Sequence, residues 1–155
     1  GDWSSDVCSS DLAEYEKTTG EVSSLSEMRR AILTIRARKF PGDGSIGTAG
    51  SFFKNPVVTD EEANAFLERF PGAPNFPQDD GRVKLSAAWI IDHVLELRGV
   101  RERNVGTWSS QALVLVNYGG ATETEMKDFA RMIIERAKKE TGITLAPEVI
   151  FVGDE

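Results

Sequence analysis

A hydroxyl, an amine and an amide follow a glycine-rich bend in residues 44–56, which read Gly-Ser-Ile-Gly-Thr-Ala-Gly-Ser-Phe-Phe-Lys-Asn-Pro. Successive side chains of an extended segment point to opposite faces, so Ser51, Phe53 and Asn55 are expected to share one face. Phe52 is expected on the other face. Asn55 precedes a proline, which disfavours helical geometry and supports an extended conformation. Ser51 and Asn55 would lie roughly 13 Å apart at about 3.3 Å per residue, which suits a ligand with several parts.

The same bend contains the pattern G-x-G-x-x-G in residues 42–47. A dinucleotide-binding fingerprint of this form needs a strand before it and a helix after it. Here the expected order is reversed, because a helix opened by Ser24-x-x-Glu27 precedes the bend and an extended segment follows it. No helix N-terminus is therefore expected to hold a pyrophosphate, and the pattern does not predict a Rossmann site. The alternative interpretation is a mobile surface loop.

Composition excludes several classes of function. The 155 residues carry a net charge of −7 without a basic cluster, which argues against a nucleic-acid partner. No apolar segment approaches the length of a membrane span, and no secretory signal pattern is visible. The single histidine, His93, lies beside Asp92 and is expected to have a partly solvated structural role, so no metal site is predicted. We expect a cytoplasmic protein that forms one domain or part of a larger one.

Residues 1–12 differ from the rest of the chain because they lack periodicity and repeat Ser-Ser. We interpret them as a non-native segment and exclude them from the fold. Cys8, the only cysteine, is excluded with them, so no disulfide is expected. If the start is foreign, the natural protein is expected to extend further, and this chain to be a fragment of it.

Helices and short strands alternate along the remaining sequence. Helices are predicted at residues 21–38, 59–70, 86–95 and 122–140, several of them behind Ser or Thr caps. The first of these is expected to pack an apolar stripe inward, formed by Leu25, Met28, Ile32 and Ile35. Strands are predicted at residues 82–85, 110–117, 143–145 and 149–152, the second being central, and an irregular loop at 71–81. This order predicts an α+β fold with helices packed on a small mixed or antiparallel sheet.

Several motifs occur in the order found in one known family: residues 35–41 (I-R-x-x-K-x-P), 47–56 (G-x-A-G-S-F-F-K-N-P), 84–89 (K-L-S-A-A-W), 111–117 (Q-A-L-V-L-V-N) and 147–149 (P-E-V). With them the chain resembles the UDP-N-acetylenolpyruvoylglucosamine reductases, also called UDP-N-acetylmuramate dehydrogenases or the MurB family, of bacterial peptidoglycan synthesis. The resemblance implies a C-terminal substrate-binding domain at residues 47–155, entered through residues 13–46. It also implies that the N-terminal FAD-binding domain, with its catalytic arginine, is absent, and it assigns no residue of this chain to cofactor binding.

The family's reaction implies that NADPH reduces FAD and that UDP-N-acetylglucosamine enolpyruvate then becomes UDP-N-acetylmuramate. By resemblance Ser51 is the proton donor, Glu148 the second catalytic residue and Lys39 a contact to the nucleotide phosphates. Asn55, Lys84 and Gln111 match further substrate positions. Each has a plainer interpretation: Lys39 as a helix C-terminal cation, Asn55 as a turn former and Lys84 as a strand-face charge.

The chemistry of the two catalytic candidates is consistent with these implied roles. Hydride arrival leaves negative charge beside the substrate carboxylate, so an acid is needed on the face opposite the flavin. Serine is a weak acid, so either neighbours tune Ser51 or the carbanion is basic enough to take its proton. An apolar setting would raise the pKa of Glu148, although a surface carboxylate is the alternative. Ile150 replaces an arginine common in the family, which puts in doubt an ion pair that orients Glu148. The alternative function is a stand-alone UDP-sugar binding module without redox activity.

Overall fold

The computed structural model describes residues 24–39 and 46–152. The chain divides into two compact units, Gly1–Gly42 and Asp43–Glu155. In the first unit the described element is the helix α2 (Leu25–Lys39), which begins where the Ser24 hydroxyl accepts a hydrogen bond from the Glu27 N–H. The prediction of an inward apolar stripe is wrong for Leu25 and Ile32, which are 90% and 45% exposed. Helical spacing defines an apolar face, but it does not supply the element that would cover it.

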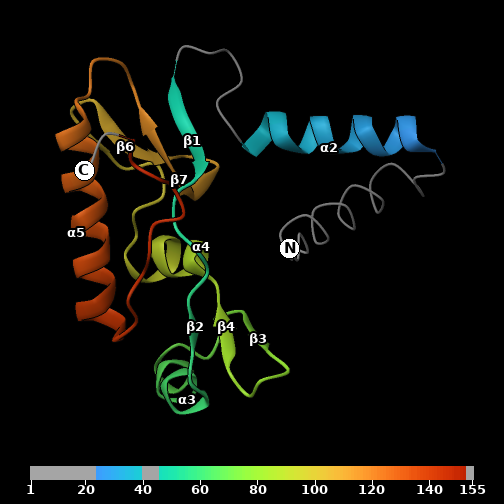
Figure 1. Ribbon diagram of the computed structural model, residues 1–155, viewed down its shortest axis with the longest axis vertical. Helices are drawn as coiled ribbons and strands as arrows, with labels where there is room; N and C mark the ends of the chain where they lie inside the picture. The colour runs from blue at the N-terminus through green and yellow to red at the C-terminus, as the bar shows by residue number, and fades with distance from the viewer. Residues whose placement is uncertain (1–23, 40–45, 153–155) are drawn as a thin grey trace. The chain divides into compact units, whose positions relative to one another are not determined.

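The second unit contains helices and two antiparallel sheets, which are built from short strands (Figure 1). Its elements are β1 (Gly47–Ser51), β2 (Val57–Val58), α3 (Asp60–Arg69), β3 (Asn75–Pro77), β4 (Val83–Leu85), α4 (Ala87–Trp89), the π-helix η1 (Ile90–Val94), β5 (Arg101–Glu102), β6 (Val105–Trp108), β7 (Gln111–Asn117) and α5 (Glu123–Thr141). One sheet has the order β1-β7-β6-β5 and the other the order β2-β4-β3. This confirms the α+β prediction and resolves its choice of sheet as antiparallel.

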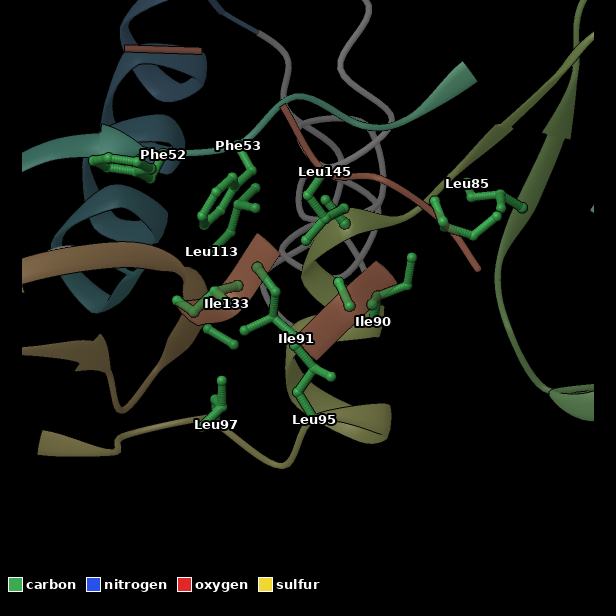
Figure 2. Close-up of a cluster of buried hydrophobic side chains, with 14 of the residues drawn as sticks. Phe52, Phe53, Leu85, Ile90, Ile91, Leu95, Leu97, Leu113, Ile133 and Leu145 are labelled. Atoms are coloured by element: carbon green, nitrogen blue, oxygen red, sulfur yellow. The ribbon is translucent and has the colours of Figure 1, made fainter. Parts of the chain in front are cut away.

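β7 lies between β1 and β6, as its run of apolar residues predicted. Residues 112–116 are all buried, because the strand is covered on both faces. α5 packs on β6 and η1 through its buried residues Phe129, Ile133 and Ala137. The apolar stripe of this helix is therefore part of the core. Figure 2 shows Phe53, Leu113 and Leu145, from three separate segments, gathered in the same apolar cluster.

Three expectations about the elements are wrong. The segment expected as an irregular loop contains β3, which pairs with β4 because Asn75 and Phe76 extend beside Leu85 and Lys84. Residues 143–145 and 149–152 do not form strands; only Pro147 forms an isolated bridge, with Phe53. The helix capped by Ser86 changes to π geometry at Ile90 after one turn. The hairpin of β5 and β6 was not predicted at all, and its turn places Arg103 at φ +54°.

Two capping boxes are confirmed, at Thr59 with Glu62 and at Thr122 with Glu125. In each box the backbone N–H and then the hydroxyl of the threonine donate to the glutamate, which holds the pKa of that carboxyl below its ordinary value of 4.5. A carboxyl whose pKa is depressed by folding stabilises the native state above the unfolded pKa. That contribution is lost as the pH falls through the lower folded pKa.

We therefore expect Glu125→Gln to flatten the loss of stability as the pH falls below the ordinary glutamate pKa of 4.5, because glutamine keeps the cap but cannot ionise. The urea midpoint of the variant should fall less on acidification than that of the parent. Glu135→Gln, which removes an exposed carboxylate outside the box on the same helix, is the matched control. Equal acid sensitivity of Glu125→Gln and the parent would show that the box contributes no pH-dependent stability.

Candidate active site

The end of β1 is reshaped by a β-bulge at Gly50. Thr48 pairs with Val116 but Ser51 pairs with Val114, so β1 uses one more residue than β7 between these pairs. Gly50 has φ +84°, a conformation that glycine adopts without strain, and its N–H donates to the Thr48 hydroxyl at 3.0 Å. Such bulges re-aim side chains, often beside active sites. Ser51 is left exposed immediately after the bulge.

The predicted alternation of residues 51–55 is wrong. Phe52 and Phe53 are both buried, at 4% and 1% exposure, and their rings meet edge to face with centroids 5.0 Å apart. Strand pairing changes at this point, because the Phe52 N–H donates to Leu113 while Phe53 bridges Pro147. The change lets two consecutive aromatic side chains enter the core. Ser51 thus does not share a face with Phe53, and the core holds the residues that follow Ser51.

Glu148 lies beside this same segment. Its N–H donates to the carbonyl oxygen of Phe52 at 2.8 Å, and the Lys54 N–H donates to Ala146 at 2.9 Å. Because Phe52 directly follows Ser51, these hydrogen bonds place the backbone of Glu148 on the segment next to Ser51, although the two residues lie far apart in the sequence. The Glu148 side chain is exposed, so the described residues do not give it the apolar enclosure that the sequence suggested.

Asn55 and Lys84 lie together near the start of α4. The Asn55 Oδ1 accepts a hydrogen bond from the Ala87 N–H at 3.0 Å, so it satisfies a backbone donor in the first turn of α4. Its Nδ2 has no hydrogen-bond partner among the described residues and can donate to a ligand. Lys84 pairs with Val57 across the sheet, and its Nζ lies 5.6 Å from the centroid of the Phe76 ring. The structure therefore places Asn55 and Lys84 on neighbouring segments.

The other two sequence-predicted binding residues are placed less completely. Gln111 begins β7, where it pairs with Trp108, and is half-buried. Lys39 is the last residue of α2 and belongs to the first compact unit. Its side chain lies outside the part of the chain that the structure describes. Its predicted contact to phosphates therefore stays a prediction.

A groove of about 380 Å³ opens beside Asn55, between the start of α3 and the end of α5. Its polar lining includes Lys54, Glu62, Lys138 and Thr144. Two ammonium groups and one carboxylate give it mixed charge. Neither Ser51 nor Glu148 lines this groove.

The elements beside the G-x-G-x-x-G pattern do not match those of a dinucleotide site. Residues 40–45, which carry most of the pattern, lie outside the described residues, but α2 precedes the pattern and β1 follows it. A strand after the pattern does not provide a helix N-terminus for a pyrophosphate. In the part of the chain that is described, no three His, Cys, Asp or Glu side chains cluster to hold a metal, and no helix is long and apolar enough to cross a membrane. His93 stacks on Trp89 with ring centroids 4.9 Å apart.

The sequence patterns did not reveal the features that position Ser51 and Glu148. In the sequence, Gly50 is one of several glycines in a glycine-rich bend. In the structure, its positive φ determines where Ser51 lies. The contact between Phe52 and Glu148 gave no signal, because pairing of distant segments leaves no local pattern. The signal that could have found Gly50 is its place directly before a polar residue in an otherwise strand-like segment.

Comparison with known proteins gives a consistent result. The sequence model of the family described as "UDP-N-acetylenolpyruvoylglucosamine reductase, C-terminal domain" matches residues 41–152. Proteins named UDP-N-acetylenolpyruvoylglucosamine reductase are similar to this chain: 45% identical over 126 residues in Chromobacterium violaceum, which is 81% of this chain and 37% of the relative. The relative in Porphyromonas gingivalis strain ATCC 33277 is 44% identical over 141 residues, which is 91% of this chain and 40% of the relative. The relative in Escherichia coli O157:H7 is 38% identical over 152 residues, which is 98% of this chain and 43% of the relative. The chain thus spans about two fifths of the length of these relatives.

Proposed function

Because this chain belongs to the family of UDP-N-acetylenolpyruvoylglucosamine reductase C-terminal domains, we propose that it is the substrate-binding and proton-donating domain of such a reductase. The substrate is UDP-N-acetylglucosamine enolpyruvate and the product UDP-N-acetylmuramate, formed in the bacterial cytoplasm for peptidoglycan synthesis. The observation that carries the proposal is the Glu148 N–H to Phe52 carbonyl hydrogen bond of 2.8 Å, which holds Glu148 beside the residue that follows Ser51.

Reduction of the enolpyruvyl C=C adds a hydride to the methylene carbon and a proton to the carbon that bears the carboxylate. FAD, once reduced by NADPH, supplies the hydride when it is bound. The described residues offer no turn that fits its pyrophosphate, so we assign FAD to a domain outside this chain. That domain and the substrate are the partners of residues 47–155, with residues 13–46 as the entering segment.

Ser51 donates the proton in this proposal. The bulge at Gly50 leaves its hydroxyl exposed, while the buried rings of Phe52 and Phe53 fix the backbone behind it. A hydroxyl held in place can protonate a carbanion as it forms, without waiting for water to diffuse in. Glu148, on the adjacent segment, is assigned as the second catalytic residue at the same enolpyruvyl group.

Four polar side chains are assigned to substrate binding. The Asn55 Nδ2 is available to donate, and its Oδ1 is already held by Ala87, so the amide is fixed in one orientation. Lys84 and Gln111 contribute from β4 and β7. Lys39 contributes an ammonium point charge for the diphosphate.

The test is a chimaera in which residues 13–155 of this chain replace the matching part of the Porphyromonas gingivalis relative, hereafter the reductase chimaera. We expect it to oxidise NADPH over many turnovers when the enolpyruvyl substrate is present, and to reduce only its bound flavin when the substrate is absent. Flavin reduction without turnover of bound substrate would overturn the reductase assignment and favour a UDP-sugar binding module. Substitution of the same segment by an unrelated sequence is the control for residual activity of the flavin domain.

Lys39→Ala in the reductase chimaera should weaken substrate binding by about 1.5–3 kcal/mol, the range for hydrogen bonds to charged groups. The Michaelis constant for the UDP-sugar reports this loss, whereas NADPH-driven flavin reduction should change little. Lys139→Ala, an exposed lysine near the end of α5, is the matched control. An unchanged Michaelis constant in Lys39→Ala would leave Lys39 as a helix C-terminal cation.

A further inference from the structure

The segment after Glu148 is anchored by one aromatic ring. Residues 149–152 alternate, with Ile150 and Val152 exposed at 89% and 93% and Val149 and Phe151 packed against the core. Ile150, which stands where the family often has arginine, is directed to solvent and cannot orient Glu148 by an ion pair. A different contact must hold this end of the segment.

The Phe151 ring lies between two partners. It meets the Phe52 ring edge to face, with centroids 6.2 Å apart and planes at 64°. The Nζ of Lys127 lies 4.9 Å from its centroid, a cation–π distance, and also pairs with Glu123 at 2.7 Å. The ring therefore connects the β1–β7 edge to the first turns of α5.

Phe52 contacts Glu148 and Phe151 through two different groups. Its carbonyl accepts the Glu148 N–H, and its ring contacts the Phe151 ring. Two attachments three residues apart restrict the backbone of the segment between them far more than one attachment does. Since Phe52 also follows Ser51 directly, movement of Phe151 would change the distance between the two catalytic candidates.

We propose that Phe151, held between Phe52 and Lys127, is a positioning residue that sets Glu148 relative to Ser51. The catalytic consequence of this positioning rests on the proposed function, whereas its geometry does not. Phe151 touches neither substrate nor cofactor in this account. It acts through the Glu148 backbone.

The first test is amide hydrogen exchange in the reductase chimaera. Phe151→Leu keeps an apolar side chain but removes both ring interactions, so exchange of the Glu148 N–H should accelerate about tenfold. The Tyr118 N–H, which donates to Asn104 at 2.8 Å on the opposite side of β7, is the internal reference and should not change. Phe151→Tyr, which keeps the ring, should exchange like the parent, and Val152→Ala is the exposed neighbouring control.

The second test is a double-mutant cycle on reoxidation of the pre-reduced flavin by substrate. Phe151→Leu should slow this step about tenfold with native Glu148, but less than about twofold in a Glu148→Gln background, because the positioned group is already lost. Unchanged Glu148 exchange, or rate effects that multiply, would overturn the proposal. If the chimaera turned over no substrate while Phe151→Leu still accelerated Glu148 exchange, the proposed function would fail and the positioning role would stand.

Discussion

Replacing Ser51 with alanine should slow reoxidation of the reduced flavin by the enolpyruvyl substrate about 10²–10⁴-fold, the usual contribution of general acid catalysis. Without the hydroxyl, the carbanion must take its proton from water or from a group farther away. Flavin reduction by NADPH should proceed at the parental rate, because Ser51 takes no part in it. Rapid mixing of the pre-reduced variant with substrate separates these two half-reactions.

Ser51→Cys keeps a protonated donor of lower pKa and should recover part of the loss if proton transfer is the affected step. Ser109→Ala, in the exposed turn between β6 and β7, is the matched control and should behave like the parent. Reoxidation of Ser51→Ala at the parental rate would move the acid role to another group, with Glu148 the first candidate.

Phe53→Ala should lower the free energy of unfolding of the chain by about 3–5 kcal/mol, the range for removing a buried phenylalanine. The side chain is 1% exposed, stacks edge to face on Phe52 and bridges Pro147, so its loss leaves a cavity where β1 meets the Glu148 segment. Urea unfolding measures the change. Ile150→Ala, at 89% exposure, should stay within about 0.5 kcal/mol of the parent.

A small loss in Phe53→Ala, of the size seen for Ile150→Ala, would show that Phe53 does not anchor the segment after Ser51. The bulge would then have to hold Ser51 without support from the core. A loss in the expected range, with the urea slope unchanged, indicates a lower stability of the same folded state.

Elements with strong local signals were predictable from the sequence. β7 was visible because its run of residues is apolar on both faces, and α5 because a capping box and a 3.6-residue apolar stripe agree. Its end at Gly142, with φ +79°, follows from the preference of glycine for left-handed geometry.

Features set by pairing of distant segments were not predictable in the same way. β5 and β6 are short, and their turn uses a left-handed Arg103, which no propensity rule favours. Residues 143–152 have strand-like composition but lie against the core with only one bridge, at Pro147, since a proline lacks the N–H that a ladder needs. The alternation expected for residues 51–55 failed because the pairing partner changes after Ser51, where Phe52 hydrogen-bonds to Leu113 and Phe53 bridges Pro147.

The candidate site shows the same division. Ser51 and Glu148 were found as residues by resemblance, but their proximity depends on the Phe52 carbonyl, a backbone atom that a sequence pattern does not reveal. Asn55 was expected to face a ligand, and the structure adds that half of its amide already stabilises α4. The positions of Lys84 and Gln111 follow from strand register, which depends on the whole sheet.

A crystal structure of the reductase chimaera with the enolpyruvyl substrate would show where the Ser51 hydroxyl lies in relation to the reacting carbon. We expect the Ser51 Oγ within roughly 3–3.5 Å of the carbon that bears the carboxylate, with the Glu148 carboxylate at the same enolpyruvyl group. A substrate bound with its enolpyruvyl group in the groove beside Lys54 and Lys138, away from Ser51, would contradict it.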